Sequence, residues 1–254
     1  MPSINVTNNF LADIAWLNAL ACNYKINNGI DVWKIRVGLS TAFINGYKPM
    51  LIGDEVARAN KFYRQQDRDR FITSRIVLRI ILSKYLNLDP EAIEFAPGLN
   101  KKPFIKNGNP CNIQYNLSHS GDAILLAIAD SIVGADVEFV NHDFGYRDVL
   151  PDNFSANEVN YITEGDSVHR FFKLWTRKEA ITKATAQGLD CDLRLLPGLD
   201  GTTTVAEHII ASDNDWVINS FNFDDQYIAS VAGNPFIGKI TFFDFAPGNF
   251  THPL

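Results

Sequence analysis

Two acidic side chains stand two residues apart in the segment GADVEFV, residues 134–140. The segment reads as a strand, and on a strand residues i and i+2 point to one face, roughly 6–7 Å apart. Asp136 and Glu138 could therefore both reach one small cation. Mg²⁺ suits the pair, because it takes oxygen ligands and commonly binds between carboxylates and substrate phosphates. The exposed face of an edge strand is the alternative explanation.

A second set of charged residues lies in FFKLWTRKEAITKA, residues 171–184. Trp175, Glu179 and Lys183 are spaced i, i+4 and i+8, so a helix would place them along one face, with Lys178 adjacent to Glu179 in the sequence. The alternative is a surface pair of Glu179 and Lys183 beside a core tryptophan, which would add little stability.

Two shorter polar segments complete the candidate set. His119 lies between two serines in NLSHSGD at the end of a predicted strand, and Lys101 and Lys102 precede the strand that begins with Pro103. A lone histidine in a turn is usually structural, and a basic pair before a strand usually lies in a solvated loop.

These residues need strands and helices to position them. Period-2 alternation predicts a strand in IDVWKIRVGLS, and helical spacing of apolar residues follows from about Asp54 to Leu88. After Asp89 and Pro90, strand-like runs occur near residues 93–95, 103–105, 113–117 and 123–129. The second half repeats this plan, with a strand at GADVEFV, helices within residues 156–186, and strands near residues 217–223, 227–232 and 239–245.

The repetition extends to particular residues. Arg70 and Phe71 stand one hundred positions before Arg170 and Phe171, and residues 124–129 resemble residues 227–232. We expect an α+β fold of two similar α/β halves related by a pseudo-twofold axis, with the site in a cleft at their interface. The halves would be residues 31–130 and 131–254, after a helix-containing extension at residues 1–30. Any two α+β segments could also align this well by chance.

Composition narrows the class of protein. The chain has 254 residues, a net charge of −6, no apolar run of membrane-spanning length and no signal-peptide pattern, so we expect a cytoplasmic protein. Its three cysteines lack metal-binding or disulfide spacing. Walker A, dinucleotide-binding and nucleophile-elbow motifs are absent. Eight basic residues against two acidic ones within residues 58–84 leave nucleic-acid binding as an alternative, although helical periodicity assigns most aromatic residues there to the core.

In the order KKPFI, NLSHSGD, GADVE and WTRKEAITK, these segments resemble the motifs of the Sfp-type 4′-phosphopantetheinyl transferases. The resemblance covers about residues 31–232. It implies transfer of 4′-phosphopantetheine from coenzyme A to a serine of an apo acyl, peptidyl or aryl carrier protein, with release of adenosine 3′,5′-bisphosphate. It also implies Mg²⁺. The duplication predicts a self-sufficient monomer, and the net charge and the lack of a long apolar run predict neither nucleic acid nor membrane as a partner. A non-catalytic scaffold that binds coenzyme A or a carrier protein is the alternative function.

The resemblance also assigns roles to residues. It implies that the metal is bound by Asp136, Glu138 and Glu179, in a solvent-filled cleft. It implies a base at Glu179, or at Glu138 through a water molecule, and a leaving-group cation at Lys183. The residues that it implies for coenzyme A are Arg70, Lys102, Ser118, His119, Lys178 and Lys183. Glu55 departs from the family, which commonly has a basic residue there, so the site for the 3′-phosphate would rely on Arg58 or Lys61.

Overall fold

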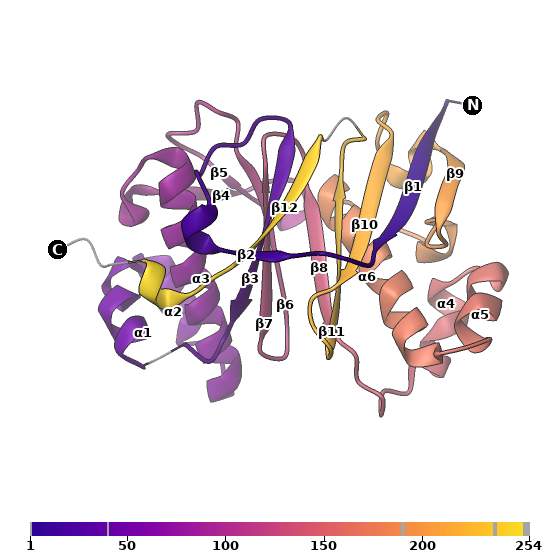
Figure 1. The fold of residues 1–254 in the computed structure, drawn as a ribbon, viewed down its shortest axis with the longest axis horizontal. Coiled ribbons are helices and arrows are strands. Elements are labelled where there is room, and N and C mark those ends of the chain that lie inside the picture. The colour runs from indigo at the N-terminus through magenta and orange to yellow at the C-terminus, as the bar shows by residue number, and fades with distance from the viewer. Residues whose placement is uncertain (1, 40, 189–190, 236–237, 251–254) are drawn as a thin grey trace.

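Alternating and helical segments of the sequence become the strands and helices of a mixed α+β fold, seen in a computed structural model that describes residues 2–39, 41–188, 191–235 and 238–250 (Figure 1). The strands are β1 (Ser3–Leu11), β2 (Trp16–Asn18), β3 (Gly29–Arg36), β4 (Phe95–Pro97), β5 (Pro103–Ile105), β6 (Gln114–Ser120), β7 (Ala123–Ala129), β8 (Gly134–Phe139), β9 (Gly201–Ala206), β10 (Trp216–Asn222), β11 (Tyr227–Gly233) and β12 (Lys239–Asp244). The helices are α1 (Thr41–Tyr47), α2 (Gly53–Ala59), α3 (Gln65–Leu86), α4 (Leu150–Asn153), α5 (Ala156–Thr163), α6 (Ser167–Thr185) and α7 (Glu207–Ile210).

The described strands form two five-stranded sheets and one short two-stranded sheet. The orders of the large sheets are β2-β12-β3-β7-β6 and β8-β11-β10-β1-β9. Each contains an antiparallel group of three, β3-β7-β6 or β8-β11-β10, in which the last strand in the sequence lies in the middle. The mixed α+β prediction is confirmed, and strand order recurs in the two halves. The twofold axis itself stays a prediction.

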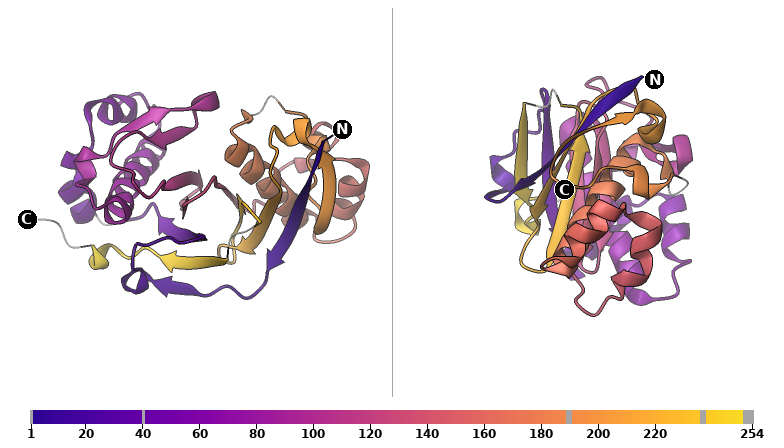
Figure 2. Two further views of the ribbon diagram at one scale, coloured as in Figure 1. Left: turned by 90° about the horizontal axis from the view of Figure 1, so that it is seen from above. Right: turned by 90° about the vertical axis from the view of Figure 1, so that its right-hand side faces the viewer.

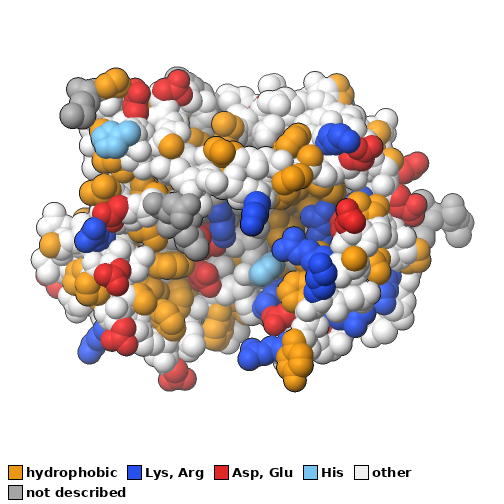
Figure 3. Space-filling model, turned by 180° about the vertical axis from the view of Figure 1, so that it is seen from behind, with side chains coloured by type: hydrophobic (Ala, Val, Ile, Leu, Met, Phe, Trp, Pro, Cys, Tyr) orange, Lys and Arg blue, Asp and Glu red, His pale blue; other side chains and the backbone are white. Residues whose placement is uncertain are grey.

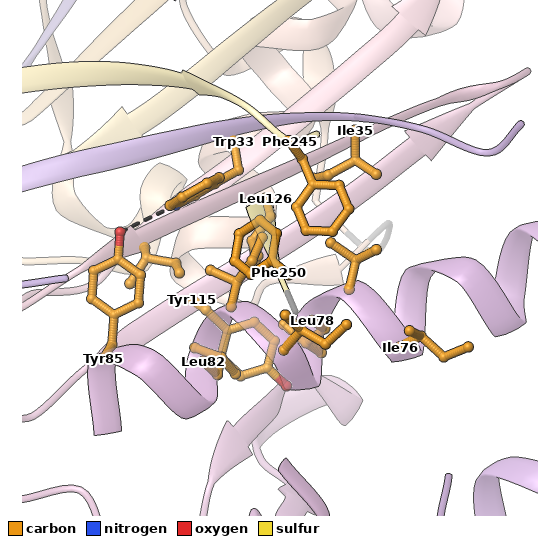
Figure 4. Close-up of a cluster of buried hydrophobic side chains, with 14 of the residues drawn as sticks. Trp33, Ile35, Ile76, Leu78, Leu82, Tyr85, Tyr115, Leu126, Phe245 and Phe250 are labelled. Carbon is orange, nitrogen blue, oxygen red and sulfur yellow. Dashed lines mark hydrogen bonds between the residues drawn. The ribbon is translucent and has the colours of Figure 1, made fainter. Parts of the chain in front are cut away.

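Helix α3 covers one face of the first sheet. Its side chains at Ile76, Leu78 and Leu82 join Trp33 and Leu126 of the sheet in one buried cluster (Figure 4). The helix ends where Asn87 adopts a left-handed conformation, with φ of 53°, directly before the predicted stop at Asp89-Pro90. The helical spacing read from the sequence therefore reports packing against this sheet.

Helix α6 packs on β8, β10 and β11 in the second sheet. It begins after Asp166, whose side chain accepts a hydrogen bond from the His169 amide, and it ends at Ala186 in the left-handed conformation. Gly134 at the start of β8 lets the helix approach, because a Cβ atom there would meet the backbone of Ala180 and Ala184. The close approach fixes the two elements that carry the predicted carboxylates.

The two ends of the chain differ from the predicted division. The predicted helix-containing extension at residues 1–30 is mostly extended in its described part, residues 2–30: β1 lies between β10 and β9 in the second sheet, and a 3₁₀ turn at Ala19–Ala21 is the only helical element there (Figure 2). Conversely, β12 pairs in parallel with β3 in the first sheet. Ile4, Val6 and Asn8 of β1 are buried at alternate positions. Pairing with distant strands therefore decided the conformation of this segment.

Two further sequence predictions concern membrane-spanning helices and disulfide bonds. None of the helices in the described residues is both long and apolar enough to cross a membrane. Cys22, Cys111 and Cys191, all within the described part of the chain, form no disulfide with one another.

Candidate active site

Polar side chains of β6 lie against the carboxylates of β8, where the two large sheets meet. The Ser118 hydroxyl donates to Asp136 Oδ1 at 2.8 Å, and the Ser120 hydroxyl donates to Glu138 Oε2 at 2.7 Å. Asn116, two residues before Ser118, accepts a hydrogen bond from the backbone amide of β8 one residue before Asp136, at 2.9 Å. Alternate residues of β6 thus join the sheets through side chains and orient both carboxylates.

Helix α6 brings a cation to the same point. Lys183 Nζ lies 2.6 Å from Asp136 Oδ1 and 3.1 Å from the Ser118 hydroxyl. Although burial alone would lower the pKa of Lys183, the charge of Asp136, with those of Glu179 and Glu138, raises it. Lys183 is therefore held as an ammonium ion among carboxylates.

Burial disfavours ionisation of all three carboxyl groups, and the charge of Asp136 adds to this effect at Glu138 and Glu179. Burial, followed by the charge of Asp136, raises the pKa of Glu138 to about 7. The same two causes raise the pKa of Glu179. Burial also raises the pKa of Asp136, although the ammonium group of Lys183 opposes this shift. A site with this excess of buried acidic groups is suited to bind added positive charge.

A cavity of about 290 Å³ opens beside this cluster, between the two halves. Its walls include Asn116 and Leu117 of β6, Glu179 and Lys183 of α6, and Pro103 of β5. Near the middle of the face opposite to that of Figure 1, Lys and Arg side chains gather around a histidine, with acidic side chains nearby (Figure 3). The arrangement can receive an anionic molecule next to carboxylates, as the sequence predicted for the interface of the halves.

The acidic cluster offers a free carboxylate oxygen for a metal ion, but it does not supply a complete set of ligands. Among the described residues, no three His, Cys, Asp or Glu side chains are close enough to hold a metal ion by themselves. Asp136 Oδ2, however, is buried without a hydrogen-bond partner. Mg²⁺ usually takes one or two carboxylates and completes its shell with water and substrate phosphates. Asp136, together with one of the neighbouring carboxylates of Glu138 and Glu179, therefore fits a metal that takes its remaining ligands from water and a phosphate-bearing substrate.

Burial of Asp136 differs from the expectation of a solvent-filled cleft. Its exposed fraction is 2%, whereas Glu138 and Glu179 are half-buried. The β8 strand is internal to the joined sheets, with β11 on one side and the side chains of β6 on the other. Substitution of Asp136 will therefore affect folding stability as well as chemistry.

Two predicted nucleotide-binding residues meet at the hairpin between β6 and β7. Arg70, in the second turn of α3, donates to the Gly121 carbonyl at 3.2 Å and forms an ion pair with Asp67. His119 is exposed on this hairpin, where the surrounding protein and the charge of Arg70 lower its pKa. The structure brings these two residues together, although Arg70 already has an acidic partner on its own helix.

Lys178 is not at this site. Its side chain is fully buried, and Nζ donates to Glu158 Oε2 at 2.9 Å and to the carbonyls of Leu193 and Leu196, both at 2.7 Å. Lys178 was predicted to lie near the pyrophosphate, but each helical residue turns by about 100°, and its ammonium group points away from the cluster around Glu179 to these partners. Its three ammonium donors are all used within the protein.

Glu55 and Lys102 also have protein partners. Glu55, where a basic residue was expected from the family, is buried and accepts hydrogen bonds from Arg75 and Arg79 at 2.6 and 2.9 Å. Arg58 lies over the Phe71 ring, 5.2 Å from its centroid. Lys102 Nζ donates to the backbone carbonyls of Val133 and Ala184.

Sequence reasoning missed two residues of this arrangement, Asn116 and Ser120. Both belong to NLSHSGD, from which only Ser118 and His119 were chosen. The signal was present in the alternation of Asn116, Ser118 and Ser120, since alternate residues of a strand share a face. Without knowledge that β6 lies beside β8, that face had no assigned partner.

Comparison with known proteins identifies the family. The N-terminal domain model of 4′-phosphopantetheinyl transferases matches residues 45–131, and the model of the 4′-phosphopantetheinyl transferase superfamily matches residues 132–232. The 4′-phosphopantetheinyl transferase HetI of Nostoc sp. is 28% identical over 216 residues, which are 82% of this chain and 88% of HetI. The 4′-phosphopantetheinyl transferase psf-1 of Bacillus pumilus is 27% identical, over 74% of this chain and 81% of its own length.

A protein of Synechocystis sp., slr0495, provisionally named a 4′-phosphopantetheinyl transferase, is 31% identical over 150 residues. These are 58% of this chain and 61% of slr0495. Together with the α+β fold and the cluster of carboxylates and lysine between the halves, the matches define a transferase of phosphopantetheine. The chain belongs to the 4′-phosphopantetheinyl transferase superfamily. Members of this family transfer phosphopantetheine to carrier proteins.

Proposed function

We propose that this chain transfers 4′-phosphopantetheine from coenzyme A to a serine hydroxyl of an apo acyl, peptidyl or aryl carrier protein. The observation that carries the proposal is the cluster of Asp136, Glu138, Glu179 and Lys183, of which Glu179 and Lys183 line a cavity between the halves. All four residues stand in the two motifs that resemble the family most specifically. A scaffold without catalytic activity would not require this group of one lysine and three carboxylates, because binding alone involves neither proton transfer nor a leaving group.

Mg²⁺ is the metal that we propose for this cluster. Asp136, with its unpartnered Oδ2, and Glu138 would hold it, together with Glu179 and the phosphates of coenzyme A. When bound, it would neutralise the pyrophosphate and polarise the attacked phosphorus. The raised pKa values of Glu138 and Glu179 support this assignment, because an added cation relieves the repulsion among the carboxylates.

The chain's own residues would move the proton and stabilise the leaving group. Glu179 takes the proton of the carrier serine as its oxygen bonds to the β-phosphorus, or Glu138 does so through a water molecule. The bond from that phosphorus to the bridging oxygen breaks, and adenosine 3′,5′-bisphosphate leaves. Lys183 stabilises the charge that develops on the leaving oxygen. Arg70 and His119 bind the nucleotide end, where a 3′-phosphate requires donors.

We further propose that one chain is sufficient for this reaction. Residues from both halves of the same chain line the cavity, so the site does not require a second copy. The carrier protein is the macromolecular partner that we expect, rather than nucleic acid. Within the basic segment 58–84, Arg75 and Arg79 point inward to Glu55 and are not available to a nucleic-acid backbone.

The test is incubation of the chain with coenzyme A, Mg²⁺ and an apo carrier protein, followed by intact-mass measurement of the carrier. We expect a mass gain of one phosphopantetheine per carrier. A carrier whose serine is replaced by alanine is the control and gains nothing. An unmodified wild-type carrier would support the scaffold alternative. Transfer at an undiminished rate after removal of all divalent metal by EDTA would contradict the role of Mg²⁺.

A further inference from the structure

The loop that precedes β5 in the first half contacts the end of α6 in the second half. Asn100 Nδ2 donates to the Ala186 carbonyl at 2.8 Å and to the Gln187 carbonyl at 3.1 Å. Lys102 Nζ donates to the Ala184 carbonyl at 2.8 Å. The last carbonyls of a helix have no partner within it, and a cation near them interacts favourably with the helix dipole. We call Asn100 and Lys102 the α6 latch.

Lys102 also binds the other element of the active site. Its Nζ donates to the Val133 carbonyl at 3.0 Å, directly before β8. One ammonium group therefore joins the backbone that leads into Asp136 and Glu138 to the backbone that follows Lys183. Burial lowers the pKa of Lys102 to about 8, and two of its three N–H donors are used by these carbonyls.

We propose that Lys102, assisted by Asn100, is a positioning residue that sets β8 against the end of α6, and that it is not a ligand of the coenzyme A 3′-phosphate. This inference rests on the proposed function. Lys183 and Asp136 meet at 2.6 Å, so a displacement of either backbone changes the geometry of the cluster. A misplacement of about 1 Å in an active site can lower the rate about a hundredfold.

The proposal separates rate from affinity. Loss of a phosphate ligand weakens binding of coenzyme A and raises its KM, but it has little effect on dephospho-coenzyme A, which lacks the 3′-phosphate. Loss of the latch displaces the catalytic cluster and lowers kcat with both donors. A residue that served overall stability alone would move neither constant in the folded enzyme.

The experiment is steady-state transfer to an apo carrier protein by the wild-type chain and by Lys102→Met, which keeps the length of the apolar side chain. Both coenzyme A and dephospho-coenzyme A are used as donors. We expect kcat to fall about ten- to a hundredfold with both donors, and KM for each to change by less than about threefold. Lys106→Met is the matched control, because Lys106 is exposed and pairs with Glu94 at the surface.

Asn100→Gly tests the latch without altering Lys102. Glycine adopts the left-handed conformation of Asn100, whose φ is 46°, while the two amide donors are lost. We expect a smaller decrease of kcat in the same direction, again with both donors. This variant decides the question if Lys102→Met does not fold.

Three results would overturn the proposal. The first is a KM for coenzyme A raised tenfold by Lys102→Met with kcat unchanged and dephospho-coenzyme A unaffected, which makes Lys102 a phosphate ligand. The second is an unchanged kcat and KM in both latch variants. Absence of transfer by the wild-type chain would overturn the proposed function, and this inference with it.

Discussion

The strands that open the two halves carry the same pattern and use it differently. Glycine, any residue, aspartate and valine stand at residues 29–32 of β3 and at residues 134–137 of β8. Asp31 accepts a hydrogen bond from the Tyr85 hydroxyl near the end of α3, at 2.7 Å. Asp136 lies 2.6 Å from the ammonium group of Lys183 near the end of α6. Each long helix therefore supplies a partner to the aspartate of its first strand.

The residue two positions after the aspartate differs between the two strands, and this residue sets the chemical character of each half. In β3 it is Trp33, whose Nε1 donates to the Tyr85 hydroxyl and whose ring stacks on Phe243. In β8 it is Glu138, which accepts a hydrogen bond from Ser120 of β6. One arrangement of strand and helix thus builds an aromatic core in the first half and an acidic site in the second. The shared arrangement of strand and helix therefore does not by itself determine the chemistry of a half.

A second feature recurs in both halves and is structural in each. Glu55 of α2 accepts the backbone amide of Ile52, and Glu158 of α5 accepts that of Ser155. Each glutamate also pairs with a buried cation of the following long helix, Arg79 or Lys178. Both cations further donate to two carbonyls of the loop after that helix. Buried charge in this protein is therefore not by itself a sign of catalysis.

The largest effect that we expect is a loss of transfer rate on substitution of Glu179, which distinguishes the acidic cluster from the buried pairs of Glu55 and Glu158. We expect Glu179→Gln to lower the transfer rate about a hundred- to ten-thousandfold, because the amide cannot accept the serine proton. The midpoint of urea unfolding should change little, since Glu179 is half-buried and the substitution preserves its shape. Carrier modification is followed by intact mass over time. A decrease below about tenfold would remove Glu179 from the role of base.

The buried pairs should respond in stability instead. Lys178→Met leaves Glu158 buried without its cation, which typically costs about 3–5 kcal/mol, and we expect the free energy of unfolding in urea to fall by that order. Arg79→Met leaves Glu55 paired with Arg75, so we expect a smaller loss of the same sign. KM for coenzyme A should stay within about threefold in the folded Lys178→Met protein. A tenfold increase of this KM would restore Lys178 to the pyrophosphate site and break the likeness between the halves.

Arg70 tests whether the first half contributes to nucleotide binding. A charge-assisted hydrogen bond contributes about 1.5–3 kcal/mol, so Arg70→Ala should weaken coenzyme A binding roughly ten- to a hundredfold. Dephospho-coenzyme A should lose much less affinity. Calorimetric titration of both ligands measures the difference, with the exposed Lys84→Ala on the same helix as control. Equal losses for the two ligands would mean that the pair with Asp67 is structural.

The smallest expected effect concerns the aspartate of the first half. Burial raises the pKa of Asp31 from 3.8 to about 6 in the folded protein. Its carboxyl group therefore ionises more readily in the unfolded chain, so its contribution to stability falls as the pH rises from about 4 through 6. Asp31→Asn should remove this loss. The free energy of unfolding of the variant, relative to that of wild type, should therefore be higher at pH 7 than at pH 4 by on the order of 1 to 2 kcal/mol.

Urea unfolding at the two pH values measures this difference, and Asp225→Asn on an exposed loop is the control. A gain that does not depend on pH would show that the pKa of Asp31 is the same in the folded and the unfolded protein.

Most secondary structure in the chain could be predicted from local pattern. Residues 123–129 form β7 as expected, and helical spacing located the C-terminal ends of α3 and α6 to within about two residues, although both helices begin well inside the predicted spans of residues 54–88 and 156–186. Spacing also placed Asp136 with Glu138 on one face of a strand and Glu179 with Lys183 on one face of a helix, because these rules depend only on residues near one another in the sequence. That the two pairs belong to one site was implied by the resemblance to the family and not by spacing.

Only the tertiary structure decided which side chains complete the site. The sequence could not assign Asn116 and Ser120 to β8, place β1 in the second sheet, or turn Lys178 and Lys102 toward backbone carbonyls. Each of these outcomes depends on a partner 15 to 210 positions away. A lysine satisfies its ammonium donors with whatever acceptors packing brings within reach, and local pattern contains no information about those acceptors.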